Sequence, residues 1–338
     1  MAAPRHLNML RTPDRHAFGV LLLLGLLAVF ALGLALMLGS VPVTAGDVLA
    51  VFAGRADGMA GRLVLELRLP RALSAFATGA LLAVAGSLMQ VLVRNPLADP
   101  YVLGISGGAA VAALLALLAG LGGLWLTGSA FGGALLAMLL VFGLAHRNGD
   151  WSPTRLLLTG VVLASGWGAL VSFLLVVSPD SRLHGMLFWL MGDLAYAGDP
   201  GPALAILGLG LLACWPLARD LNVLQRGDLQ AGALGVDTRK LQRRLYLLAS
   251  LLTASAVVQA GSIGFVGLVI PHLVRLLGLT DHRLLLPGAA LAGGGLLVLA
   301  DTLARTLLAP QQLPVGIITA LIGIPLFLHL LQRGARTP

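Results

Sequence analysis

Long apolar runs dominate this sequence and restrict its fold more than any other feature. The clearest runs cover residues 17–39, 66–92, 126–146, 155–178, 286–308 and 314–332. An α-helix needs about 20 apolar residues to cross the hydrocarbon core of a bilayer. Charged residues make up 11% of the chain, against about 25% in a soluble domain. We therefore predict an all-α polytopic membrane protein.

Four weaker runs complete the predicted bundle. Residues 102–120, 202–218 and 241–260 are apolar but interrupted by glycine or polar residues, and residues 264–278 form a short stretch. Counting these runs gives about ten transmembrane helices in a single domain that covers residues 1–338. Residues 182–196 are amphipathic, and we expect them to lie at the membrane interface rather than across the membrane.

The basic residues predict the orientation of these helices. With ten spans and a cytoplasmic N-terminus, most of the 22 lysine and arginine residues face the cytoplasm, as the positive-inside rule requires. We expect residues 1–16 to form a cytoplasmic tail, residues 219–244 to form the longest cytoplasmic connection, and the C-terminus to lie on the same side. This topology explains the net charge of +8, and no basic patch with interleaved aromatic residues indicates a nucleic-acid partner.

The sequence argues against catalysis and nucleotide binding by this chain. Lys240 is the only lysine and follows no glycine-rich loop, so the P-loop route to ATP is excluded. Cys214 is the only cysteine and lies inside an apolar run, where a small core residue is expected. No group of side chains has the spacing of a catalytic or metal site, so we predict neither, and no resident cofactor.

A stiff, polar connection separates two of the apolar runs. Pro96 and Pro100 end the preceding helix, because proline lacks the backbone N–H and clashes with the turn before it. Asn95 and Asp99 can hydrogen-bond the local backbone that remains unpaired. A connection built this way holds its shape, which is useful beside a pore.

Six arginines depart from the charge bias, and three of them are informative. Arg68 and Arg71 lie at the outer mouth of the second span, and Arg305 lies near the outer end of the ninth. They either snorkel to the interface or form a positive rim that receives carboxylates from a soluble partner. Asp301 lies one helical turn before Arg305, so an internal ion pair is expected there.

Two further segments carry candidate roles. In the connection 219–244, Asp228 can cap a short helix and Gly235 can end it, which gives either a docking element for a motor subunit or a solvated turn. In residues 261–272, small residues allow close helix packing, and Pro271 predicts a broken or short span. We expect His272 to pack or hydrogen-bond rather than bind a metal.

Several motifs, in the same order along the chain, resemble those of the FecCD-type family. Members of this family are the permease subunits of ABC importers for cobalamin and iron chelates. The resemblance runs from about Arg62 to Arg333. The motifs occupy residues 67–71, 86–90, 94–100, 103–109, 261–272, 279–288, 300–305 and 313–320.

The resemblance implies ten helices per subunit and a homodimer with the pore on its two-fold axis, in a bacterial inner membrane. It implies that two cytoplasmic subunits bind and hydrolyse ATP, that one periplasmic protein delivers the substrate, and that this chain is not an enzyme. Cobalamin, siderophores and haem are the implied substrates.

The resemblance also implies roles for single residues. Arg68, Arg71 and Arg305 would dock the binding protein. Asn95, Leu97, Ser152 and Thr154 would form the cytoplasmic gate. The segment that couples to the ATPase would contain Gly227, Asp228, Leu229, Ala231, Leu234 and Gly235.

Two positions depart from the family pattern. Gln312 stands where many members have a glutamate, and Pro153 stiffens the turn where other members carry a hydroxyl residue. The alternative function is an ion-coupled secondary transporter, which ten spans and Asp301 would permit. The absence of an inverted repeat of acidic spans counts against it.

Overall fold

The computed structural model describes residues 15–39, 41–55, 58–145 and 152–334, and in these ranges the chain is helical without strands. The predicted tail 1–16 therefore lies almost entirely outside the described residues. The helices are α1 (Arg15–Met37), α2 (Ala45–Phe52), α3 (Met59–Arg62), α4 (Leu69–Val93), α5 (Ile105–Leu118), α6 (Leu124–Ala145), α7 (Pro153–Val177), α8 (Asp180–Leu190), α9 (Gly201–Cys214), α10 (Ala218–Leu224), α11 (Asp228–Ala233), α12 (Thr238–Ala260), α13 (Val266–Leu276), α14 (His282–Thr306) and α15 (Val315–Gly334). A π-helical turn, Leu63–Arg68, joins α3 to α4, and two 3₁₀ turns cover Pro100–Leu103 and Leu194–Tyr196.

The prediction of an all-α polytopic membrane protein is confirmed, because each of the ten predicted runs contains a helix. Among the described residues, five segments are long and apolar enough to span a bilayer, and the bent pair α9–α10 makes six. The remaining four are α5, α13 and α15, which are shorter, and α12, which begins with several basic residues. The segment predicted to lie at the interface forms α8, which buries Met186 and Trp189.

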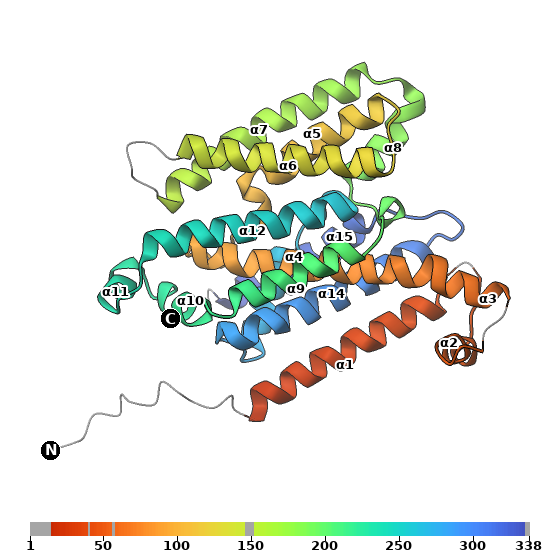
Figure 1. The fold of residues 1–338 in the computed structure, drawn as a ribbon, viewed down its shortest axis with the longest axis horizontal. Helices are drawn as coiled ribbons and strands as arrows, with labels where there is room; N and C mark the ends of the chain where they lie inside the picture. The colour runs from red at the N-terminus through yellow and green to blue at the C-terminus, as the bar shows by residue number, and fades with distance from the viewer. Residues whose placement is uncertain (1–14, 40, 56–57, 146–151, 335–338) are drawn as a thin grey trace.

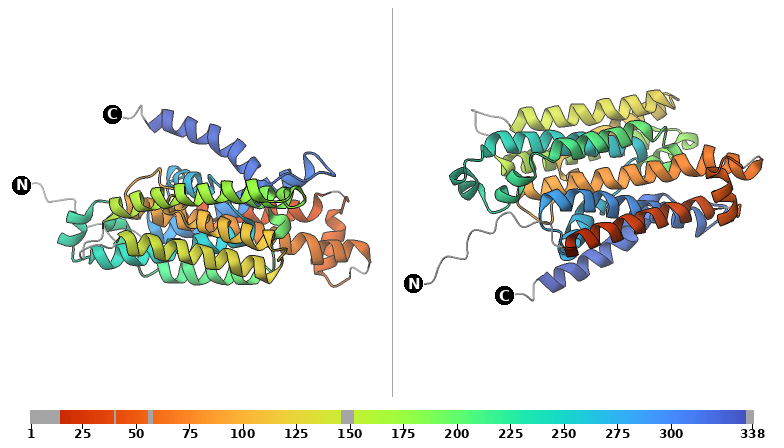
Figure 2. Two further views of the ribbon diagram at one scale, coloured as in Figure 1. Left: turned by 90° about the horizontal axis from the view of Figure 1, so that it is seen from above. Right: turned by 60° about the horizontal axis from the view of Figure 1, so that its bottom comes forward.

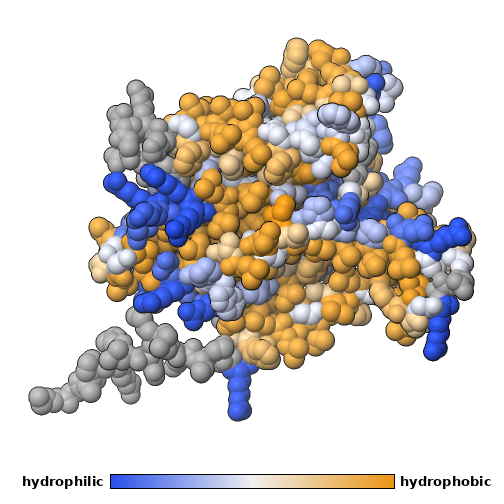
Figure 3. All heavy atoms as spheres, in the orientation of Figure 1, coloured by the Kyte–Doolittle hydropathy of each residue, from blue (hydrophilic) through white to orange (hydrophobic). Residues whose placement is uncertain are grey.

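The long helices run roughly parallel between two polar ends (Figure 1). We call the end with α2 and α3 the outer end, and the end with α10 and α11 the cytoplasmic end, following the predicted topology. Hydrophilic residues gather at both ends, while the surface between them is mainly hydrophobic (Figure 3). This is the pattern expected of helices that cross a bilayer.

α4 forms the centre of the bundle, and all of its residues from Ala77 to Leu92 are buried. Close backbone contacts hold it there. A methyl group on Gly79 would overlap the carbonyl oxygen of Gly293 in α14, and one on Gly86 would overlap the carbonyl oxygen of Gly267 in α13. Small residues at such crossings let helix backbones approach closely in a membrane.

The break before α13 differs in position from the prediction. The helix continues through Pro271, whereas the chain is irregular from Gly261 to Phe265. Phe265 has a left-handed backbone (φ 69°), and Gly261 lies so close to Trp189 that a side chain would overlap its carbonyl oxygen. The proline therefore shortens no helix here; the span is short because the backbone unwinds before α13 begins.

Two helices on the outside of the bundle have few neighbours. α7 buries only 11% of its most apolar stretch, and α15 diverges from the other helices towards the C-terminus (Figure 2). Both therefore leave apolar surface uncovered by the rest of the chain.

Candidate functional sites at the two ends of the bundle

A pocket of about 430 Å³ opens at the outer end, and it contains all three arginines predicted for docking. Arg68 comes from the π-helical turn, Arg71 from the first turn of α4, and Arg305 from the last turn of α14. Gln312 and Glu66 also line the pocket. The fold thus brings together residues that are far apart in the sequence.

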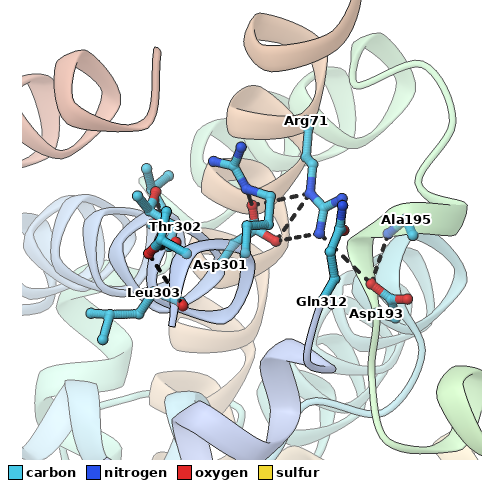
Figure 4. Close-up of polar contacts among 10 residues, drawn as sticks. Arg71, Asp193, Ala195, Asp301, Thr302, Leu303 and Gln312 are labelled. Carbon is cyan, nitrogen blue, oxygen red and sulfur yellow. Dashed lines mark hydrogen bonds and ion pairs between the residues drawn. The ribbon is translucent and has the colours of Figure 1, made fainter. Parts of the chain in front are cut away.

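Asp301 lies at the centre of this cluster and is 1% exposed. Its Oδ1 accepts a hydrogen bond from Arg71 Nη2 (2.8 Å), and Arg71 Nε lies 3.1 Å from both carboxylate oxygens (Figure 4). Arg305 Nε donates to Oδ2 at 3.0 Å. The expected pair of Asp301 with Arg305 is confirmed, and Arg71 extends it to a three-residue network.

The three arginines differ in how the donors of their guanidinium groups are satisfied. Arg68 is 5% exposed, and its guanidinium donates to the carbonyl oxygens of Leu36, Met37 and Val41, which follow or end α1. These carbonyls lack intrahelical partners, so the side chain caps α1. By contrast, the buried Nη2 of Arg305 has no hydrogen-bond partner in the described part of the chain. Docking by these residues stays a prediction.

Two more polar residues shape the outer site. The amide oxygen of Gln312 accepts a hydrogen bond from Arg71 Nη1 (3.0 Å). Asp193 accepts from the backbone N–H of Ala195 and lies 3.8 Å from Arg71. Burial raises the pKa of the Asp193 carboxyl above its usual value. Sequence reasoning missed Asp193, because it lies in a loop and its partner Arg71 is far away in the chain.

At the cytoplasmic end, the connection after α4 has the stiff geometry that its prolines predict. The Oδ1 of Asn95 accepts a hydrogen bond from the backbone N–H of Leu97 (2.9 Å), and that of Asp99 accepts from Tyr101 (2.8 Å). The predicted local bonds of Asn95 and Asp99 are therefore confirmed. Leu97 stands 44% exposed at the tip.

The other predicted gate element begins α7. The hydroxyl of Ser152 accepts from the backbone N–H of Arg155 (3.2 Å) and caps the helix, Pro153 occupies its first turn, and Thr154 is exposed. The 3₁₀ turn Pro100–Leu103 packs against α7 beside Gly160. The turn that follows the connection thus contacts α7, and the action of the two elements as a gate stays a prediction.

The predicted coupling segment folds into α11, with one correction. Gly227 (φ 115°) precedes the helix and Gly235 (φ 82°) follows its end, as expected. Asp228 was predicted to cap the helix, but it is the first helical residue and makes no capping bond. Its carboxylate instead lies 3.0 Å from Arg94 Nη2 and accepts from Gln242 Nε2 (3.1 Å). The charged guanidinium of Arg94, which folding brings close, binds this carboxylate more strongly than a local backbone N–H would.

α11 has one buried side and one apolar side that faces outward. Ala231 is fully buried, whereas Leu229 is 91% exposed and Leu234 is 63% exposed. Beside it, Asn222 of α10 donates to Asp281 and accepts from the backbone N–H of His282, at the start of α14. Sequence reasoning missed Arg94, Asn222 and Gln242, because each partner lies far away in the chain.

Comparison with known proteins agrees with this architecture. Residues 26–333 match the FecCD transport family. The chain is 45% identical to the hemin transport system permease protein HmuU of Yersinia pestis, over 80% of this chain and 83% of that protein. It is 44% identical to the cobalamin import system permease protein BtuC of Halobacterium salinarum, over 80% of this chain and 73% of the other.

Longer matches extend over almost the whole chain. The vitamin B12 import system permease protein BtuC of Escherichia coli O127:H6 is 38% identical over 98% of this chain and 100% of its own. A metal-chelate type ABC transporter solved in an inward-facing conformation superposes with a TM-score of 0.80 at 33% identity, over 94% of this chain and 99% of that one. The chain is thus a multi-pass transport subunit that belongs to the FecCD transport family.

Proposed function

We propose that this chain is the permease subunit of an ABC importer for a metal chelate, either cobalamin or an iron chelate such as haem or a siderophore. In this proposal the chain does no covalent chemistry. Two cytoplasmic partner subunits bind and hydrolyse ATP, and a periplasmic protein delivers the substrate to the outer end in a bacterial inner membrane.

One observation carries the proposal: α4 and α14 run between two surfaces at opposite ends of the bundle, and each surface is suited to bind a protein partner. At the outer end, Arg71 and Arg305 line an open pocket. At the cytoplasmic end, Leu229 and Leu234 are exposed on a short helix. Exposed apolar residues on a face outside the membrane favour a protein partner, and arginine pairs well with carboxylates.

We propose that a second copy of the chain completes the pore. The apolar surface left open on α7 and α15 is large, and the glycines Gly166 and Gly168 on α7 have no atom near the place of a side chain. A homodimer would cover part of this surface. The remaining surface of α7 would then line the path of the substrate, where small side chains leave room.

The relatives named for hemin and for cobalamin are about equally similar to this chain, so the substrate class is proposed and not the single compound. The test is uptake by vesicles that contain the chain with its ATPase and binding protein. Labelled cyanocobalamin, haem and a ferric siderophore are compared, and the proposal predicts accumulation of one of them. Accumulation of none, by a complex that assembles and hydrolyses ATP, would contradict the substrate class.

The alternative of an ion-coupled transporter needs an acid whose charge is free to change. Asp301 is the intramembrane acid in question, and both of its oxygens accept hydrogen bonds from arginines. Both sides of the carboxylate are therefore engaged by side chains of α4 and α14. The structure therefore favours a structural role for Asp301.

A further inference from the structure

An ion pair joins the cytoplasmic end of α4 to the first residue of α11. Arg94 Nη2 lies 3.0 Å from Asp228 Oδ2, and the other oxygen of Asp228 accepts from Gln242 in α12. The gate connection begins at the next residue, Asn95, whose backbone N–H donates to Gln90 in the last turn of α4. The pair is thus a direct polar link between the proposed coupling helix and the proposed gate.

The backbone at Arg94 shows that the arginine side chain is not needed to end the helix. Arg94 has a left-handed conformation (φ 53°, ψ 37°), in which glycine is the ordinary residue and any other costs roughly 1 kcal/mol. The N–H groups of Arg94 and Asn95 already satisfy the last carbonyls of α4. A residue in a strained conformation is retained where its side chain makes a functional contact. Here the side chain pairs with Asp228.

Solvent exposure separates this link from the stability of the fold. The side chains of Arg94 and Asp228 are 42% and 37% exposed. A pair this exposed contributes about 0–1 kcal/mol to folding. Its removal therefore leaves the bundle folded, while it frees the coupling helix from the gate.

We propose that Arg94 and Asp228 are positioning residues that transmit the movement of the coupling helix to the gate connection. When partner subunits move α11, the pair pulls on the cap of α4 and on the residues that follow it. Asn222 anchors α10 to the start of α14 through Asp281 and His282. In this proposal α11 tilts relative to the anchored α10, and the movement displaces Arg94. This inference rests on the proposed function.

The test uses the complete complex with its ATPase and binding protein, reconstituted in vesicles. The variants are Arg94→Gly, which relieves the backbone strain and deletes the side chain, and Asp228→Asn, which keeps its shape. The double variant R94D/D228R restores an ion pair with reversed charges. Lys240→Gln is the matched control, because it removes an exposed ion pair of the same segment (3.0 Å to Asp237) that does not touch the gate.

Three readouts distinguish coupling from folding and assembly: the melting temperature, co-purification of the ATPase, and substrate imported per ATP hydrolysed. Arg94→Gly and Asp228→Asn should assemble and hydrolyse ATP, with import per ATP reduced at least about fivefold. The reversed pair should regain part of this loss, and Lys240→Gln should match the unaltered complex. Unchanged import per ATP in both single variants would overturn the inference. Failure of the unaltered complex to import with ATP would instead overturn the proposed function.

Discussion

Arg71 and Asp301 are separated by 230 residues in the sequence, yet Arg71 Nη2 lies 2.8 Å from Asp301 Oδ1. The contact joins the first turn of α4 to the last turns of α14, and Arg305 binds the same carboxylate from the other side. Asp301 therefore fixes the position of two of the three pocket arginines. It closes the outer end of the helix pair whose glycines meet further along, at Gly79 and Gly293.

Asp301→Asn should strongly destabilise the protein. The change leaves the buried guanidinium of Arg305 without its countercharge and leaves Arg71 with only the longer contact to Asp193, and breaking a buried ion pair costs about 3–5 kcal/mol. The melting temperature in detergent should fall clearly, whereas Arg62→Gln, a change at an exposed arginine of α3, should leave it unchanged. An unaltered melting temperature for Asp301→Asn would mean that the network adds nothing to stability.

Asp193→Asn should stabilise the folded protein at neutral pH. Burial raises the pKa of the Asp193 carboxyl, so the folded state holds its proton more tightly than the unfolded chain. Stability from this group is present at low pH and is lost as the pH rises through the folded pKa. Asparagine keeps the bond to Ala195 without the charge. The variant should therefore melt higher than the wild type at pH 8 and approach it at acidic pH; a variant that is less stable at pH 8 would show that the ion pair with Arg71 dominates.

The arginines of the pocket should separate into two groups. Arg68→Gln removes the cap of α1, and hydrogen bonds from a charged group contribute about 1.5–3 kcal/mol. It should lower the melting temperature and affect docking little. Arg305→Gln removes a guanidinium that lines the pocket and should weaken binding of the periplasmic protein about tenfold or more at low salt. Affinity measurements on the complex in nanodiscs check this, and the account is wrong on this point if Arg68→Gln weakens binding more than Arg305→Gln.

Gly86→Ala should prevent correct packing of the central helix. Its new methyl group would overlap the backbone of Gly267, and overpacking of this kind costs about 1–3 kcal/mol or more. Gly132→Ala in α6 is the control, since no atom lies near the place of its side chain. The yield of monodisperse protein on size exclusion and its melting temperature give the comparison. Equal behaviour of the two variants would contradict the close contact of α4 with α13.

Leu97→Cys tests the homodimer and the gate together. Leu97 is 44% exposed at the tip of the gate connection, and the natural Cys214 is fully buried, so an oxidant should reach the new thiol alone. We expect a cross-linked dimer in at least one nucleotide state of the complex. Leu124→Cys, at the exposed outer start of α6, should give none. If Leu97→Cys cross-links in no nucleotide state, Leu97 does not lie at the dimer axis.

The sequence predicted the helices well because their signal is local. A run of apolar residues specifies a span wherever the helix packs, and the turns at Pro96, Pro100 and Gly235 follow from the backbone limits of single residues. The break in the span was predicted at Pro271, whereas the irregular segment runs from Gly261 to Phe265. Proline in a membrane helix is tolerated, so its presence did not locate the break.

The partners of charged residues could not be predicted in the same way. An arginine at the outer mouth looks the same in sequence whether it pairs with a carboxylate of a distant helix, as Arg71 does, or caps another helix, as Arg68 does. Asp228 likewise carries the sequence signature of a helix cap, but Arg94 competes for its carboxylate, and only the folded bundle brings the two together.

ATP-driven import is the most direct test of the account. Vesicles that contain the chain, its ATPase and its binding protein should accumulate the chelate when ATP is supplied to the cytoplasmic side. Uptake should persist when ionophores dissipate proton and sodium gradients, and it should stop when the ATPase is omitted. Uptake that continues without the ATPase and stops with the ionophores would contradict the account and establish an ion-coupled transporter.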